Sequence, residues 1–335
     1  MQVVFVTGAT GFLGSHLVCA LLQKGYFVQA AKRAQSSLNE FTFISDLYFG
    51  QDKTLVVNNL KWVEGDILDY EFLLENIKKD QLVFHCAGLV SFHKSDQEKL
   101  YQMNVVGTKN MVNACLENSS KKLIHVSSTA AIGKAEGELT TDETNLWDEK
   151  DGVSNYSASK YYAELEVWRG IEEGLKAVIV NPCIIIGPGD WNRGTGLFFR
   201  NASRNFPFYT SGSNAFVSVF DVAKAMIELG QNNLNAERYL VIGENLKFQE
   251  LMNLMSDALK ARRPRIEINP WLAALAWRWY YLRELLTRKR GLITKESADS
   301  SFKTICYSNK KIKDALNFEF TSIKDLVEYA VINKS

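Results

Sequence analysis

Short runs of apolar, often β-branched residues alternate with longer amphipathic segments through the first half of the chain. The run VVFVT at 3–7 predicts a buried strand, and the segment after it has apolar residues at helical spacing and ends on Gly25. Further helical patterns are clearest at 97–117 and 156–173. The other strand-like runs occupy 26–32, 61–65, 82–88, 122–128 and 177–182. Such alternation, with strands that are apolar throughout, is typical of a parallel sheet covered on both faces. We therefore predict an α/β fold with a doubly wound parallel sheet.

The alternation weakens after Pro182, where glycines mark an irregular stretch, and it returns over 216–243 as a strand, a helix and a further strand. The remainder of the chain is mainly helical. We predict a larger domain over 1–182, to which 216–243 returns. A smaller C-terminal α/β part should be built from 183–215 and 244–330, with a cleft between the two.

Composition narrows the class of protein without naming it. Apolar residues make up 46% of the chain and charged residues 23%, and the net charge of +1 gives no global attraction to nucleic acid. The five cysteines form no CxxC pair, and the four histidines lack the spacing of metal ligands. No run reaches the roughly 20 apolar residues of a membrane span, and the N-terminal run lacks the layout of a signal peptide. We expect a cytoplasmic protein with reduced thiols and without a metal site.

Three glycines follow the first predicted strand and open the first predicted helix, in GATGFLG at 8–14. Glycine permits the tight turn and lets the backbone approach a pyrophosphate, while the N–H groups of the first helical turn face the anion. The alternative is a tight turn that binds nothing. We favour a dinucleotide cradle, which makes 1–182 a dinucleotide-binding domain of the Rossmann type. Its expected contacts are Gly8, Thr10, Gly11, Phe12, Leu13 and Gly14.

The residues at the end of the second strand should contact the adenosine ribose of the cofactor. NAD-selective sites usually place a carboxylate there, but this chain has Lys32 and Arg33, followed by Ser36 and Ser37. Because a guanidinium suits phosphate oxygens, the segment favours NADP(H) over NAD(H), the alternative being an exposed basic turn.

A carboxylate also follows the third strand. Asp66 is placed to accept a hydrogen bond from the adenine amino group, with Ile67 packed on the ring. Its alternative role is that of a helix N-cap.

A tyrosine and a lysine four residues apart, Tyr156 and Lys160, should share one face of a helix. A phenol is a poor base because its free pKa is about 10, and a nearby ammonium would lower that pKa. Ser128, at the carboxyl end of a strand, is placed to orient a substrate oxygen, and Asn104 lies on the preceding helix. Alone, such a Tyr–Lys pair is more often structural. Together with the cradle, these residues fit the interconversion of a carbonyl and an alcohol by hydride transfer.

In order along the chain, the segments TGATGFLG, HCAG, NVVGT, VSS, YSASK and NPCIIIGPGD resemble those of the extended short-chain dehydrogenase/reductases, the family that includes NAD-dependent epimerases and dehydratases. FVSVFDVAKA and ERYLVIGENLKFQEL match as well, so the resemblance covers nearly the whole chain. It implies Tyr156 as acid and base, Lys160 as its modulator and ribose ligand, Ser128 as substrate anchor and Asn104 as support for a proton relay. It also implies cofactor contacts from Ala87, Gly88, Val90, Pro182 and Ile185.

The branch of the family is read from two stretches. The family's dehydratases carry an Asp-Glu pair just after the serine strand, where this chain has Ser128-Thr129-Ala130-Ala131. The NP…GPGD stretch resembles dihydroflavonol 4-reductase-like and 3β-hydroxysteroid dehydrogenase-like members rather than sugar-nucleotide epimerases. We therefore predict an NADP(H)-dependent reductase or alcohol dehydrogenase for a fairly apolar small molecule. A nucleotide-sugar epimerase and a non-enzymatic cofactor-binding regulator are the alternatives.

Two surfaces suggest partners. The resemblance implies a homodimer through a four-helix interface formed by 97–117 and 156–173. Residues 258–295 contain ten Lys/Arg against two Glu, and Leu272, Leu275, Trp279, Leu282 and Leu286 fall on one helical stripe. We expect this helix to cover the substrate cleft, with contact to an anionic membrane surface as the alternative.

Overall fold

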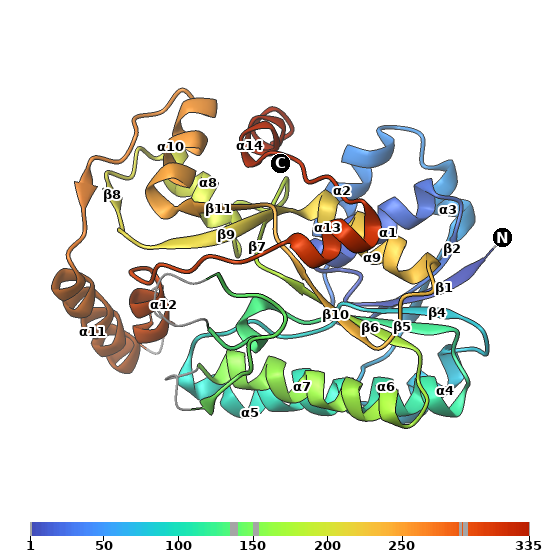
Figure 1. Cartoon of the computed structure of the whole chain (residues 1–335). Helices are drawn as coiled ribbons and strands as arrows, with labels where there is room; N and C mark the ends of the chain where they lie inside the picture. Colours follow the sequence, from blue (N-terminus) through green and yellow to red (C-terminus); the bar gives the residue numbers. More distant parts are fainter. Residues whose placement is uncertain (1, 135–139, 150–153, 288–289, 291–293, 335) are drawn as a thin grey trace.

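The main sheet has seven parallel strands in the order β10-β6-β5-β4-β1-β2-β3 (Figure 1). The computed structural model describes residues 2–134, 140–149, 154–287, 290 and 294–334. The predicted Rossmann-type sheet is confirmed, and every strand-like run of the first half contributes one strand. The strands are β1 (Val3–Thr7), β2 (Phe27–Lys32), β3 (Leu60–Glu64), β4 (Leu82–His85), β5 (Lys122–Val126), β6 (Ala177–Pro182) and β10 (Glu237–Val241).

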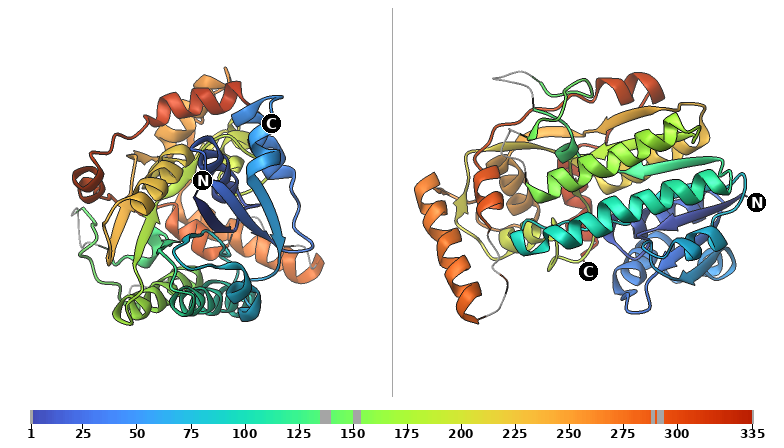
Figure 2. Two further views of the ribbon diagram at one scale, coloured as in Figure 1. Left: turned by 90° about the vertical axis from the view of Figure 1, so that its right-hand side faces the viewer. Right: turned by 90° about the horizontal axis from the view of Figure 1, so that it is seen from below.

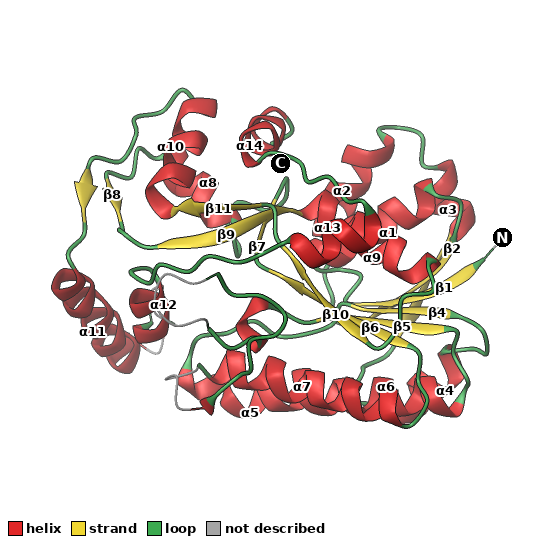
Figure 3. Cartoon of the chain, viewed as in Figure 1, coloured by secondary structure: helices red, strands yellow, loops and turns green. Residues whose placement is uncertain are grey.

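Helices cover both faces of this sheet, as Figure 3 shows. One face carries α1 (Phe12–Gln23), α2 (Asn39–Phe49), α3 (Thr54–Asn59), α9 (Val219–Gln231) and α13 (Lys310–Leu316). The other carries α4 (Tyr70–Asn76), α5 (Gln97–Leu100), α6 (Gly107–Glu117) and α7 (Asn155–Glu172). Each face has its own buried apolar cluster. Successive residues of a strand point to opposite faces, so the strands are buried on both sides.

The predicted helix at 97–117 is not regular along its whole length. Between α5 and α6 the segment Tyr101–Val106 is π-helical. A π-helical turn widens the backbone and often lies at a functional site. Asn104 lies in this turn and is buried.

A second, three-stranded sheet stands beyond the carboxyl end of the main one. Its order is β11-β9-β7, with β7 (Ile184–Ile186), β9 (Ser213–Ser218) and β11 (Glu244–Lys247). With α8 (Gly196–Ser203), α10 (Phe248–Ala258) and α14 (Ile323–Ile332) it encloses a third apolar cluster. The segment 216–243 was predicted to return to the larger domain. Its helix α9 packs on the main sheet and its strand β10 is part of that sheet, whereas β9 belongs to the smaller part. β9 pairs with β7 and β11 instead.

Two helices stand at the end of the molecule far from the N-terminus. α11 (Pro270–Thr287) packs on α12 (Lys295–Ser300), near the short pair β8 (Phe208–Tyr209) and β12 (Ile266–Glu267) (Figures 1 and 2). Among the described residues, no helix is both long and apolar enough to cross a membrane.

Candidate active site

The glycine segment after β1 forms a tight cradle at the start of α1. Gly8 has a φ of +68°, and the N–H of Gly11 donates to its carbonyl oxygen at 3.0 Å. A Cβ on Gly14 would lie 2.0 Å from the Gly8 oxygen, and one on Gly8 would lie 2.6 Å from the Ala87 nitrogen. Among the described residues, no side chain caps the start of α1. The segment therefore has the close backbone approach and the uncapped helix start that a pyrophosphate requires.

At the end of β2, one of the two predicted phosphate ligands already has a partner. The Nζ atom of Lys32 lies 3.1 Å from Oε2 of Glu64, its register partner on β3. Arg33 is exposed in the following turn, where its N–H donates to Oγ of Ser36 at 3.2 Å. Ser37 is exposed and accepts from the N–H of Asn39 at 3.2 Å. Arg33 is thus the better placed cation for a 2′-phosphate.

Asp66 lies at the start of the loop after β3, and its Oδ1 accepts from the N–H of Leu68 at 3.0 Å. The alternative role of Asp66 as a helix cap is wrong, because Asp69 caps α4 through the N–H of Phe72. Ile67 is buried, and its Cδ1 would lie 2.5 Å from a Cβ on Gly107 of α6.

The loop after β4 holds three predicted cofactor contacts, of which Ala87 lies against the cradle at Gly8. The N–H of Ala87 donates to Oγ1 of Thr7 at 3.3 Å, which ties the loop to the end of β1. Gly88 leaves space beside Asn104 and Lys160, since a Cβ there would lie 3.2 Å from Asn104 Oδ1 and 3.8 Å from Lys160 Nζ. Val90 is exposed at the pocket.

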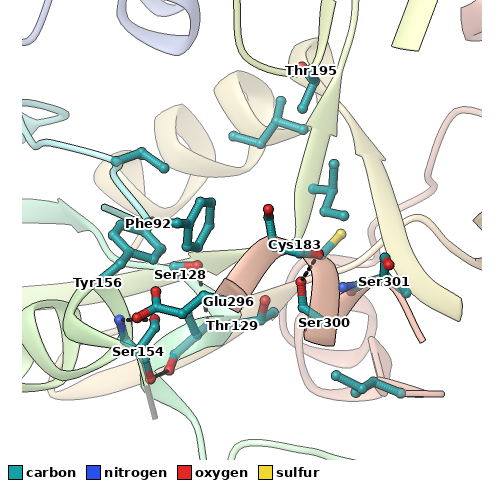
Figure 4. A pocket seen from close by; sticks show the side chains of 18 of the residues that line it. Phe92, Ser128, Thr129, Ser154, Tyr156, Cys183, Thr195, Glu296, Ser300 and Ser301 are labelled. Carbon is teal, nitrogen blue, oxygen red and sulfur yellow. Dashed lines mark hydrogen bonds between the residues drawn. The ribbon is translucent and has the colours of Figure 1, made fainter. Parts of the chain in front are cut away.

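Tyr156 stands in the first turn of α7, which Ser154 caps by accepting from the N–H of Ser157. Phe92 packs edge-on against its ring, with 5.7 Å between the centroids (Figure 4). Burial raises the pKa of Tyr156, and a hydrogen bond with Ser128 opposes that shift. The net shift is opposite to the lowering expected from a nearby ammonium, and the modulating role of Lys160 stays a prediction. Enclosure of the phenol penalises the phenolate more than its neighbours stabilise it.

Lys160 lies one turn further along α7 and is buried. Its Nζ donates to the carbonyl oxygen of Val126 at 2.8 Å, at the end of β5. Burial lowers its pKa to about 8, while the negative charge of Glu164 acts in the opposite direction. Pro182 and Ile185 line the same pocket as Lys160.

A buried polar cluster that sequence reasoning missed lies beyond Lys160. Glu164 Oε1 accepts from Nδ2 of Asn181 at 2.5 Å, and Arg238 Nη1 lies 3.6 Å from its Oε2. Nδ2 of Asn181 also donates to the Ser128 carbonyl oxygen at 3.0 Å, so the cluster reaches the strand end that holds the predicted substrate anchor. The signal was present in part, because Glu164 follows Lys160 at helical spacing.

Asn104 uses its whole amide within the protein. Its Oδ1 accepts from the Leu89 N–H at 2.7 Å, and its Nδ2 donates to the Leu89 oxygen at 3.0 Å and to Ser159 Oγ at 2.9 Å. It therefore fixes the loop after β4 against α7. With three bonds made, the side chain acts here as a brace for that loop.

A pocket of about 960 Å³ opens from the Tyr156–Lys160 pair toward the smaller part of the molecule. Ser128 and Tyr156 lie on one side, and the opposite walls are mainly apolar. Those walls include Phe198, Phe206, Phe208, Phe248, Met252 and Ile268. The expectation that the helix over 271–286 covers the cleft is wrong for the described residues, because α12 lines the pocket and α11 does not.

α12 brings an acidic side chain that the sequence did not reveal. Figure 4 shows Glu296 pointing from α12 toward the side of the pocket that holds Tyr156, Ser128 and Ser154. Its Oε2 is buried without a hydrogen-bond partner among the described residues. Burial raises the pKa of Glu296, and the nearby charges of Lys94 and His93 lower it.

The fold and this constellation define a nucleotide-dependent enzyme of the short-chain dehydrogenase/reductase class. Residues 4–243 match the model of the NAD-dependent epimerase/dehydratase family, and the chain belongs to that family. It is 30% identical to a putative dihydroflavonol 4-reductase of Synechocystis, over 98% of this chain and 93% of that protein. It is 28% identical to cinnamoyl-CoA reductase 1 of Petunia hybrida, over 96% of this chain and 89% of that protein.

Solved structures agree on the fold. The crystal structure of gox2253 superposes with a TM-score of 0.80 at 29% identity, covering 99% of this chain and 97% of that chain. A UDP-glucose 4-epimerase of Thermotoga maritima has a TM-score of 0.75 at 20% identity, with 99% and 98% covered, which shows the fold alone. With the family and its reductase relatives, the chain is an NAD(P)-dependent oxidoreductase that acts on carbonyl and alcohol groups of a small molecule.

Proposed function

We propose that the protein is an NADP(H)-dependent enzyme that interconverts a ketone or aldehyde and a secondary alcohol on a fairly apolar small molecule, with Tyr156 as acid and base. The observation that carries this proposal is the place of the Tyr156 phenol. It lies beside Ser128, at the side of a mainly apolar pocket that also reaches the cofactor cradle.

Each residue of the constellation has one task in this mechanism. Ser128 donates to the substrate oxygen and orients it, and Tyr156 donates a proton to that oxygen as the carbonyl is reduced or takes it back during oxidation. The nicotinamide, when bound, supplies or accepts the hydride. The raised pKa of Tyr156 keeps the phenol protonated at neutral pH, which is the form that reduction requires.

The cofactor would be held from its two ends. The cradle of Gly8, Gly11 and Gly14 fits the pyrophosphate, since side chains there would fill the space. Lys160 would hold the nicotinamide ribose, and Pro182 and Ile185 would flank the nicotinamide. Asp66 with Ile67 would bind the adenine, and Ala87, Gly88 and Val90 would contact the cofactor from the loop after β4.

NADP(H) is favoured over NAD(H) by the charge at the end of β2. Arg33 is exposed in the turn where a 2′-phosphate would lie, and Lys32 adds a second cation whose charge Glu64 offsets in part. Fluorescence titration with NADPH and NADH tests this preference directly. Tighter binding of NADH would contradict it.

The direct test of the activity is a panel of ketones, aldehydes and secondary alcohols, followed through the absorbance of NADPH. We expect turnover on neutral members with apolar or aromatic groups, as the reductase names of the relatives also suggest. Turnover restricted to nucleotide sugars would favour the epimerase alternative instead.

We also propose a cytoplasmic homodimer. α6 and α7 pack together on the outer layer of the main domain, and Leu165 of α7 and Tyr101 beside α6 are exposed apolar groups there. All five cysteines are free thiols, as a reducing compartment requires. Light scattering of the wild type and of Leu165→Glu tests the dimer; a monomeric wild type would overturn it.

A further inference from the structure

We propose that α11 is a docking surface for an anionic lipid membrane, on which the protein rests without crossing the bilayer. Four members of the predicted stripe have described side chains, and Trp271 extends the stripe by one residue at the start of the helix. These five side chains are exposed to between 43% and 68% of their surface; they are Trp271, Leu272, Leu275, Trp279 and Leu282. At 3.6 residues per turn they fall within a sector of about 100°, which is the width of a buried helix face.

The opposite face of α11 is the one that packs on the protein. Ala273, Ala276, Trp277 and Tyr280 are half-buried there, and α11 contacts α12. Glu284 lies on this inner side, with its carboxylate 3.8 Å from Nδ1 of His93. The helix therefore differs from an ordinary surface helix, because Leu272, Leu275 and Trp279 are exposed on its outer face while the inner face is apolar as well.

The charges around the stripe favour an anionic lipid surface as its binding partner. Arg278 borders the stripe on one side and Arg283 on the other, and both are exposed. Glu284 is the only acidic residue of α11, and it faces inward. Tryptophan rings favour the boundary between headgroups and acyl chains, and each arginine near an anionic surface adds attraction.

A second copy of the chain fits this surface less well. In a two-fold interface the same patch meets itself, so the arginine borders of one copy would face those of the other without a carboxylate between them. An anionic lipid surface supplies the missing negative charge. Its headgroups would accept hydrogen bonds from both guanidinium groups while the stripe enters the acyl boundary.

The end of the molecule that carries α11 has further exposed apolar residues. Phe206 and Phe208, beside and within β8, are partly exposed and also line the pocket, and Ile266 of β12 is exposed. β8, β12 and α11 stand at the same end in Figure 1, and α11 marks that end of the molecule again in the right panel of Figure 2. A lipid surface held by α11 would therefore lie at the pocket end of the enzyme.

Co-sedimentation of the full chain with vesicles at low salt tests the proposal. We expect binding to phosphatidylcholine vesicles that contain phosphatidylglycerol, weaker binding to pure phosphatidylcholine, and loss of binding as salt rises. W271A/W279A should reduce the vesicle affinity about tenfold or more, and R278E or R283E about fivefold or more each. None of these residues belongs to the proposed catalytic site, so the melting temperature and the turnover of a water-soluble substrate should stay near wild type.

Tyr281→Ala is the matched control. Tyr281 is an exposed aromatic residue of the same helix but lies off the stripe, so its removal should leave vesicle binding unchanged. Absence of binding to anionic vesicles at low salt would overturn the proposal. So would equal losses in Y281A and W271A/W279A, or light scattering in which the stripe variants convert a dimer to a monomer without any vesicle binding by the wild type.

Discussion

Glu164 lies one helical turn beyond Lys160 on α7, and both side chains are buried. The negative charge of Glu164 raises the pKa of Lys160, against the desolvation that lowers it to about 8. Replacing Glu164 by Gln keeps the shape and removes the charge, so the pKa of Lys160 should fall further, by about one pH unit or more. If protonated Lys160 holds the cofactor ribose, the alkaline limb of kcat/KM moves to lower pH by the same amount.

The control for this variant is Glu166→Gln, on the same helix. Oε2 of Glu166 lies 2.9 Å from Nε of Arg169. Its charge is therefore paired with Arg169 and not with Lys160. Its pH profile should match that of the wild type. An unchanged profile in Glu164→Gln would contradict the electrostatic link between Glu164 and Lys160.

The buried lysine also makes folding stability depend on pH. The pKa of Lys160 is about 8 in the folded protein and near 10.5 when exposed, so the unfolded chain binds more protons between these values. Its burial cost is fully present below pH 8 and is relieved as the pH rises toward 10.5. The free energy of unfolding of the wild type, relative to Lys160→Met, should therefore increase across that window. Denaturant titrations without cofactor measure it, and a flat or falling difference would rule out this protonation change.

The proton-transfer role of Tyr156 can be separated from cofactor binding. Tyr156→Phe removes only the hydroxyl, so kcat should fall by about a hundredfold or more, while the dissociation constant of NADPH stays within a factor of about two. Tyr162→Phe is the control, because the Tyr162 hydroxyl bonds Glu149 outside the pocket. Turnover near the wild-type level in Tyr156→Phe would refute the assignment.

The sequence was informative where a local pattern of residues indicates one structural role without reference to the rest of the chain. Apolar runs of strand length without alternation indicate strands buried on both faces, and the six such runs up to Pro182 all lie in the seven-stranded sheet. Gly8 and Gly14 predicted the tight turn between β1 and α1, because the space at both positions excludes any side chain. Neither inference needed knowledge of distant contacts.

Features that depend on distant contacts were out of reach. The partner of Lys32 follows from the β2–β3 register, which sets it opposite Glu64. Glu296 reaches the pocket across a long stretch of chain from Tyr156, in a segment with no strong pattern of its own. On α11 the spacing identified an apolar stripe but could not say which way it faced, since that depends on what α12 packs against.

Substitutions of Arg33 and of Glu64, the ion-pair partner of Lys32, should change the affinity for NADPH in opposite directions. Arg33→Ala should weaken NADPH about tenfold and leave NADH nearly unchanged, because only NADPH carries the 2′-phosphate. Glu64→Gln should tighten NADPH by about fivefold, since it frees Lys32 and removes a nearby negative charge. Fluorescence titrations measure both. Lys61→Ala, an exposed cation on β3, is the control, and a similar loss there would point to general charge instead of a phosphate site.

Glu296 should act on substrate choice through its charge. A carboxylate in an apolar pocket disfavours an anionic substrate, so Glu296→Gln should raise kcat/KM for a carboxylate-bearing ketone about tenfold relative to its neutral analogue. Because burial raises the pKa of Glu296, the wild type should discriminate weakly at low pH and more strongly as the pH rises through that pKa. Glu296→Gln should lose this pH dependence. Asp314→Asn, an exposed acid on α13, should keep it. A Glu296→Gln enzyme with wild-type selectivity at every pH would show that this carboxyl does not face the substrate.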